Sequence, residues 1–120
     1  MSHRPAGSPA VIPRIVTDDA AGLVAFLKRV FAAAGEYQRT APTQLRIGDS
    51  LVMVSSADSR ESFPAFLYVY VEDADAVYQR ALDAGAASLE AVWDTPYGDR
   101  RGMVEDRWGN VWQIATHRPR

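Results

Sequence analysis

The order of sequence features along this chain occurs twice, and this repetition constrains its fold most. Each half runs from a β-rich segment to an acidic pair, an apolar helical stripe, a glycine and further β-rich segments. A shift of 54 positions superposes residues 12–19 on 66–73, and a shift of 60 superposes 51–54 on 111–114. Because a fixed offset is typical of an internal repeat, the sequence predicts two similar modules in tandem.

Two amphipathic helices are predicted, one in each half. Their apolar stripes are Leu23, Phe26, Leu27, Val30 and Phe31, and Ala74, Val77, Tyr78, Ala81 and Leu82. The acidic pairs at 18–19 and 72–73 resemble paired carboxylates for acid–base chemistry, but at helix starts we expect them to act as caps. Gly35 and Gly85 are the expected helix ends.

The remaining segments are rich in β-forming residues. Pro13 removes one hydrogen-bond donor from the first of them, so this segment enters a sheet at a start, a bulge or an edge. Residues 38–56 are expected to form two or three short strands with a turn at Gly48 and Asp49. The predicted strands outside that region are 11–17, 66–71, 87–93, 100–105 and 111–116.

The length of 120 residues fits one domain, because domains commonly contain roughly 100–150 residues. Residues 1–9 carry two prolines, a glycine and two serines, and we expect a flexible leader there. Residues 10–120 then form the single domain. Within it we expect module one at 10–57, a polar linker at 58–64 and module two at 65–117.

Composition excludes several classes of function. The chain has no cysteine, which excludes disulfides, thiolate metal sites and cysteine nucleophiles. Its net charge of −2 does not favour a nucleic-acid partner, and no apolar run approaches the roughly 20 residues of a membrane span. Its only histidines are His3 and His117, which makes a catalytic triad or a multi-histidine metal site unexpected. We expect a cytoplasmic protein with neither a nucleic-acid nor a membrane partner.

Several segments together carry a resemblance to a known family. They are Val16 to Ala20, the helix Leu23 to Phe31, Leu45 to Ser50, Tyr68 to Val77, Gly98 to Arg100 and Asp106 to Gln113. In this order and spacing the chain resembles the vicinal-oxygen-chelate superfamily, which includes glyoxalase I, extradiol dioxygenases and bleomycin-resistance proteins. The PhnB-like branch resembles it most closely.

The resemblance implies an α+β fold of two tandem βαβββ modules, whose curled mixed sheet surrounds a shared cleft that a homodimer usually completes. In metal-binding members the cleft holds one divalent ion on four side chains. The corresponding positions here are Ile12, Met53, Phe66 and Gln113. Ile, Met and Phe offer a hard cation no oxygen or nitrogen, and neutral Gln offers one weak carbonyl. We therefore expect no metal and no cofactor.

Strand alternation gives the cleft an aromatic and apolar lining. If Phe66 faces the cleft, Tyr68 and Tyr70 do as well, because every second side chain of a strand points the same way. The candidate ligand-binding residues are Arg14, Met53, Phe66, Tyr68, Tyr70, Trp93 and Gln113. The aromatic residues could instead be sheet packing, and Arg14 a surface or interface charge. We expect Asp94 and Asp99 to form exposed pairs with Arg100 and Arg101, and His117 to be a solvated end residue.

Three hypotheses about function remain open at this point. The first is metal-independent binding or sequestration of a small, planar aromatic molecule, as in antibiotic-sequestering members of the family. The second is a lyase, isomerase, hydrolase or dioxygenase that uses a recruited metal or a Tyr, Asp or Arg acid–base pair. The third is a partner or regulatory module whose cleft is filled by its own side chains.

Overall fold

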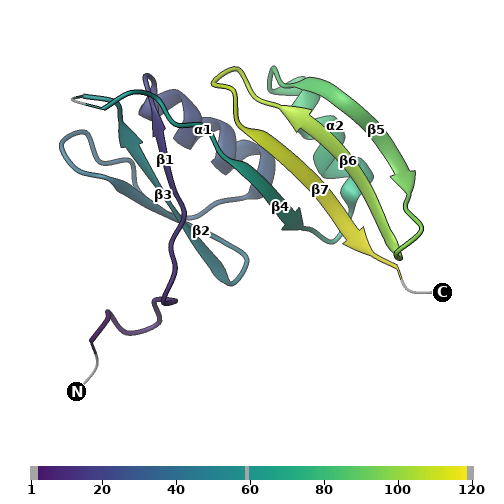
Figure 1. Ribbon diagram of the computed structural model, residues 1–120, viewed down its shortest axis with the longest axis horizontal. Helices are drawn as coiled ribbons and strands as arrows, with labels where there is room; N and C mark the ends of the chain where they lie inside the picture. The colour runs from purple at the N-terminus through teal and green to yellow at the C-terminus, as the bar shows by residue number, and fades with distance from the viewer. Residues whose placement is uncertain (1–2, 59, 119–120) are drawn as a thin grey trace.

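The computed structural model describes residues 3–58 and 60–118. Expectations for residues 1–2 of the leader, residue 59 of the linker and residues 119–120 therefore lie outside the described residues. Within the described residues, two helices and seven strands follow one another (Figure 1). They are β1 (Arg14–Thr17), α1 (Ala20–Phe31), β2 (Thr43–Ile47), β3 (Ser50–Ser56), β4 (Phe66–Tyr70), α2 (Ala74–Asp83), β5 (Ala87–Asp94), β6 (Asp99–Glu105) and β7 (Val111–His117).

The strands form two separate sheets that lie side by side (Figure 1). The first has the order β1-β3-β2 and the second the order β4-β7-β6-β5. The strands β1 and β3 are parallel in the first sheet, and β4 and β7 are parallel in the second. All other pairs are antiparallel. The α+β class is confirmed, but the expectation of one curled sheet is wrong, because the two sheets are not joined into a closed surface.

The first half has one strand fewer than the expected βαβββ order. Residues 36–42 lie outside any strand, and in place of a fourth strand there is an isolated antiparallel bridge between Ala34 and Arg46. At Gly35, between the bridge and these residues, the chain passes so close to β2 that a Cβ would lie 2.5 Å from the backbone oxygen of Gln44. The first sheet therefore ends at β2.

Aspartate caps begin both helices, as the acidic pairs predicted. Asp19 accepts a hydrogen bond from the backbone nitrogen of Gly22 at 3.0 Å, and Asp73 accepts one from that of Ala76 at 3.1 Å. The end of α1 differs from the prediction. The helix ends at Phe31 because Ala32 adopts a left-handed conformation with φ of 54°, before the chain reaches Gly35.

One apolar core joins the two halves. The helix α1 packs on the first sheet and α2 on β5, β6 and β7, with both helices behind the sheets in Figure 1. The rings of Phe31 and Trp112 lie 5.2 Å apart, and those of Phe26 and Trp108 lie 5.9 Å apart. Both pairs connect α1 to the second half, so neither half has a core of its own.

A buried carboxylate organises the turn between β6 and β7. Asp106 accepts hydrogen bonds from the indole nitrogen of Trp112 at 2.9 Å and from the amide side chain of Asn110 at 2.9 Å. Asn110 in turn accepts the backbone N–H of Ala65 at 2.9 Å, just before β4. This network holds the turn between β6 and β7 against the start of β4, because Asn110 is bonded to both Asp106 and Ala65.

Candidate ligand-binding site

Three aromatic side chains project from β4 on the side away from α2, which we call the open face of the second sheet. Phe66, Tyr68 and Tyr70 are 66%, 38% and 61% exposed. The alternate residues Leu67 and Val69 are partly buried and pack against the core. This alternation agrees with the pattern of the sequence, in which every second residue shares a face.

Strand register places most of the predicted site residues together. Side chains at paired positions of neighbouring strands share a face of the sheet. Tyr68 pairs with Gln113, and Gln113 pairs with Met103. In the next row Tyr70 pairs with Ala115, Ala115 with Arg101, and Arg101 with Trp93. The open face therefore carries five of the seven candidates, namely Phe66, Tyr68, Tyr70, Trp93 and Gln113.

The other two candidates lie on the first sheet. Arg14 on β1 and Met53 on β3 are paired in register and share a face there. The guanidinium Nε of Arg14 donates to the hydroxyl of Ser55 in the same sheet at 2.7 Å. Among the described residues, no hydrogen bond joins Arg14 to the second sheet. Ile12 precedes β1 and is half-buried.

A buried carboxylate lies at the end of the open face where β6 begins and β7 ends. Asp99, at the start of β6, is 3% exposed. Its Oδ2 accepts the hydroxyl of Tyr68 at 2.5 Å and that of Tyr70 at 2.8 Å, and its Oδ1 lies 2.8 Å from Nδ1 of His117. We call these four residues the Asp99 cluster. The phenol rings of Tyr68 and Tyr70 are 5.3 Å apart and tilted by 58°.

The hydrogen bonds of the Asp99 cluster shift the acidity of its members. Those from Tyr68 and His117 lower the pKa of the Asp99 carboxyl, because they stabilise its charged form. Burial and the hydrogen bond to Asp99 raise the pKa of Tyr68 far above its ordinary value. The same carboxylate raises the pKa of Tyr70. At neutral pH the cluster therefore consists of an ionised carboxylate and two protonated phenols.

A second polar group lies beside it on the open face. Arg101 forms an ion pair with Glu90 and donates to the hydroxyl of Tyr97 at 2.9 Å. Glu90 also accepts the indole N–H of Trp93 at 2.8 Å. The hydrogen bond to Arg101 lowers the pKa of Glu90, so both groups are charged at neutral pH. The salt bridge thus fixes the indole of Trp93 at the margin of the site.

The structure corrects three expectations about residues near the C-terminus. Asp99 is buried rather than exposed, Arg101 is mostly covered, and His117 is bound to Asp99 instead of being a free end residue. The reason is the alternation along β6, which turns positions 99 and 101 to the open face with Met103. The predicted strand began at residue 100, and a strand that begins at residue 99 would have placed Asp99 and Arg101 on one face. Arg100, on the other side, pairs with Asp75 and Asp94 at the surface.

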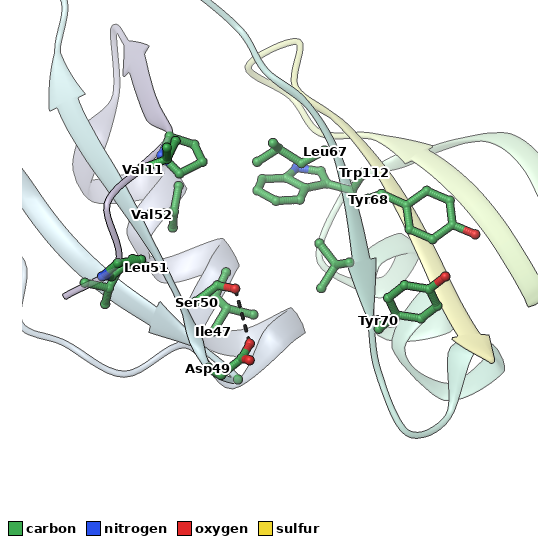
Figure 2. Close-up of a pocket in the computed structure, with 14 residues that line it drawn as sticks. Val11, Ile47, Asp49, Ser50, Leu51, Val52, Leu67, Tyr68, Tyr70 and Trp112 are labelled. Carbon is green, nitrogen blue, oxygen red and sulfur yellow. Dashed lines mark hydrogen bonds between the residues drawn. The ribbon is translucent and has the colours of Figure 1, made fainter. Parts of the chain in front are cut away.

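A separate groove lies between the two sheets. It has a volume of about 610 Å³ and is lined by residues of the segment before β1, the β2–β3 hairpin and β4. Figure 2 shows Leu67 and Trp112 on its side of β4, while the rings of Tyr68 and Tyr70 extend to the other side. The groove and the open face therefore meet at β4, where Tyr68 and Tyr70 also border the groove although their rings extend to the open face.

Comparison with known proteins establishes the family. A family model described as the Glyoxalase/Bleomycin resistance protein/Dioxygenase superfamily matches residues 13–114. The chain belongs to this superfamily. An uncharacterized protein of Mycobacterium bovis is 32% identical over 125 residues, which cover 89% of this chain and 82% of that protein. The PhnB-like branch is not identified by these matches.

Solved structures of the superfamily share this fold. TioX from Micromonospora sp. ML1 has a TM-score of 0.76 at 24% identity, covering 92% of this chain and 99% of that one. The fosfomycin resistance protein FosX from Mesorhizobium loti has a TM-score of 0.68 at 18% identity, covering 90% and 91%. At these identities the likeness shows the fold alone. Superfamily members bind small molecules and often form dimers.

The residues at the expected metal-ligand positions do not fit a divalent cation. Ile12, Met53 and Phe66 present only hydrocarbon or thioether, and Gln113 one neutral carbonyl. In residues 3–58 and 60–118, no group of three or more His, Asp or Glu side chains is arranged to hold a metal ion. In the same ranges no helix is both long enough and apolar enough to cross a bilayer.

Proposed function

We propose that the protein binds a small, planar aromatic molecule on the open face of the second sheet without a metal ion. The observation that carries the proposal is the row of exposed aromatic side chains on β4, of which Tyr68 and Tyr70 are fixed by hydrogen bonds to the buried carboxylate of Asp99. Aromatic rings stack on flat ligands, and hydrogen bonds that fix a ring reduce the entropy lost on binding. Phe66, Tyr68, Tyr70 and Trp93 would contact the ligand, and Gln113 would orient its polar groups.

Affinity alone would be the mechanism of this function. Sequestration withdraws a compound from solution without changing it, so it needs no nucleophile and no Lewis acid. The two phenols nearest the site are held as protonated donors to Asp99. A sequestering protein of this type would protect a cell from a toxic aromatic compound, as antibiotic-resistance proteins do.

The proposal extends to the assembly. We propose that a second copy of the chain faces the open face in a homodimer and brings Arg14 and Met53 of its first sheet to the site. The first sheet carries the exposed Arg14 and Arg46, whereas the open face carries Asp99, Glu90 and Glu105. This charge complementarity favours the pairing. We also propose that the chain divides into modules at 10–57 and 65–117. A place in the PhnB-like branch and a cytoplasmic location are further parts of this proposal.

A metal-free acid–base enzyme is the second candidate. It is favoured by the contact between His117 and Asp99, which orients the imidazole with its Nε2 available. A histidine oriented by a carboxylate is a common general base. Incubation of a bound compound with the protein, followed by mass spectrometry, separates the two candidates. Sequestration leaves the mass of the compound unchanged, whereas an enzyme converts it.

Native mass spectrometry of the freshly purified protein tests the proposal first, because one spectrum reports the oligomer, any metal and any retained small molecule. We expect a metal-free dimer. Titration with quinoline and 4-aminoquinoline, followed by tryptophan fluorescence, then measures binding. The double variant Phe66→Ala and Tyr68→Ala should lose binding while circular dichroism still shows a folded chain, although the loss of one donor to Asp99 lowers its stability.

A matched control places two alanines in the groove instead, at Val11 and Leu51. This control should bind both probes as the wild type does. A stoichiometric divalent ion that is needed for binding would overturn the proposal. So would equal loss of binding in both double variants, because the open face would then have no special role.

A further inference from the structure

The two phenols of the Asp99 cluster are arranged so that they offer a ligand acceptors and no donors. A tyrosine hydroxyl has a single hydrogen to donate. Tyr68 and Tyr70 both direct theirs to Oδ2 of Asp99, at 2.5 and 2.8 Å. Each phenol oxygen can therefore only accept a hydrogen bond from a molecule on the open face.

His117 extends this surface of acceptors. An ionised carboxylate has no hydrogen to donate, so the 2.8 Å contact with Oδ1 of Asp99 places a proton on Nδ1 of the imidazole. In the neutral ring the other nitrogen, Nε2, then carries a lone pair. The side chain is 56% exposed, which leaves this acceptor open to solvent or to a ligand.

The charged groups of the open face also favour a ligand that donates hydrogen bonds. Asp99 and Glu90 contribute two negative charges, and Glu105 lies on the same face at its other end. Arg101 is the cation that faces them, and it is already held by Glu90 and Tyr97. Within one copy of the chain, the three carboxylates of the open face outnumber the guanidinium of Arg101. The tilted rings of Tyr68 and Tyr70 add the negative faces of two π systems.

We propose that the open face selects planar aromatic cations whose N–H groups donate to Tyr68, Tyr70 and His117. The inference rests on the function proposed above and names the chemical class of its ligand. A protonated aromatic amine satisfies the acceptors, and its charge is attracted by the carboxylates and the tyrosine rings. A neutral ring of the same shape stacks but leaves the acceptors without donors. An aromatic carboxylate is repelled.

Four probes of similar size separate these contributions. They are 4-aminoquinoline, which is protonated at neutral pH and carries N–H donors; N-methylquinolinium, a cation without N–H donors; neutral quinoline; and anionic 2-naphthoate. Isothermal titration of the purified full chain should give 4-aminoquinoline a dissociation constant at least about 10-fold below that of quinoline, a difference that one or two good polar contacts supply. N-methylquinolinium should lie between them, and 2-naphthoate should bind most weakly.

A conservative double variant isolates the acceptors from the rings. Tyr68→Phe with Tyr70→Phe keeps both rings and removes both oxygens. Its affinity for 4-aminoquinoline should fall more than its affinity for quinoline, so that the preference for 4-aminoquinoline falls by about 10-fold. The control Tyr37→Phe, at an exposed tyrosine between α1 and β2, should preserve the preference. Circular dichroism checks that each variant is folded, and if the double variant is unfolded the two single variants replace it.

The outcomes distinguish the two proposals. If no probe binds the wild type, the proposed function is overturned together with this inference. If quinoline binds as well as 4-aminoquinoline, or if 2-naphthoate binds best, the inference is overturned and the binding function stands. If the double variant keeps the full preference for 4-aminoquinoline, the phenol oxygens are not the acceptors, and the inference is likewise overturned.

Discussion

The hydroxyl of Tyr68 and the carboxylate of Asp99 are 31 positions apart in the sequence and 2.5 Å apart in the structure. Their strands, β4 and β6, are not neighbours, because β7 lies between them. The contact therefore crosses a strand on the open face. It is possible because β7 contributes the small side chain of Ala115 beside Tyr70. The polar centre of the candidate site thus depends on three strands of the second sheet.

Replacing Asp99 by asparagine should make the stability of the protein less dependent on pH. Hydrogen bonds lower the pKa of Asp99 in the folded state, so its ionised form stabilises the fold above its unfolded-state pKa of about 3.9. This stabilisation is lost as the pH falls through the lower, folded-state pKa. In urea unfolding between about pH 7 and pH 3, Asp99→Asn should be less stable than wild type at neutral pH, and the difference should shrink in acid.

The matched control is Asp94→Asn, because Asp94 is an exposed partner of Arg100 and surface ion pairs contribute little. This variant should follow the wild type at every pH. A difference between Asp99→Asn and wild type that stays constant down to the lowest pH would contradict the assignment of an ionised, hydrogen-bonded Asp99.

Two of the five tyrosines should ionise late in an alkaline titration. Burial is the largest cause that raises the pKa of Tyr68. For Tyr70 the largest cause of a raised pKa is the hydrogen bond to Asp99. Tyrosinate absorbance in the near ultraviolet should therefore rise in separate steps, and Tyr68→Phe should remove part of the late step. Tyr37→Phe should leave that step intact. Simultaneous ionisation of all five phenols while circular dichroism still shows a folded chain would refute the network.

Trp112→Phe should destabilise the fold strongly. Trp112 is 1% exposed, and its indole N–H is bonded to the buried Asp106. The substitution leaves a small cavity and removes one donor from a buried carboxylate, at a cost of about 2–3 kcal/mol in the free energy of unfolding. The same change at Trp93, which is 44% exposed, should cost less than about 1 kcal/mol. Equal effects in urea unfolding would show that the turn network contributes nothing.

Gly35 and Gly48 offer a matched pair of alanine substitutions. Both have positive φ, of 144° and 59°. A Cβ at Gly35 would meet the backbone oxygen of Gln44 at 2.5 Å, whereas one at Gly48 would have open space around it. Gly35→Ala should therefore cost more than about 2 kcal/mol, and Gly48→Ala about 1 kcal/mol. Thermal or urea unfolding measures both, and a larger cost at Gly48 would contradict the close packing of the chain at Gly35.

Much of the fold follows from local patterns. The helix starts at Asp19 and Asp73 were predictable, because a capping carboxylate before an apolar stripe is a local signal. The alternation of Phe66, Tyr68 and Tyr70 likewise predicted one shared face. Two features could not be found in this way. The separation into two sheets and the missing strand of the first half depend on how distant segments pair, which local propensity does not determine.

The candidate site was predictable only in part. Its aromatic residues lie on a strongly β-forming strand whose alternation is visible in the sequence. Asp99 and His117, by contrast, lie at a strand start and near the C-terminus, where charged residues are commonly solvated. The burial of Asp99 and its contact with His117 follow from the pairing of position 99 with position 117 in β6 and β7, a register that no local pattern contains.

The central claim is that the open face of the second sheet binds aromatic molecules without a metal. Nuclear magnetic resonance of the chelator-treated protein during titration with 4-aminoquinoline tests it most directly. We expect saturable shifts of the signals from Trp93, Met103 and Gln113. The signals from Val11, Ile47 and Leu51 in the groove should stay unchanged. Shifts confined to the groove, or no saturable shift until a divalent metal is added, would contradict it.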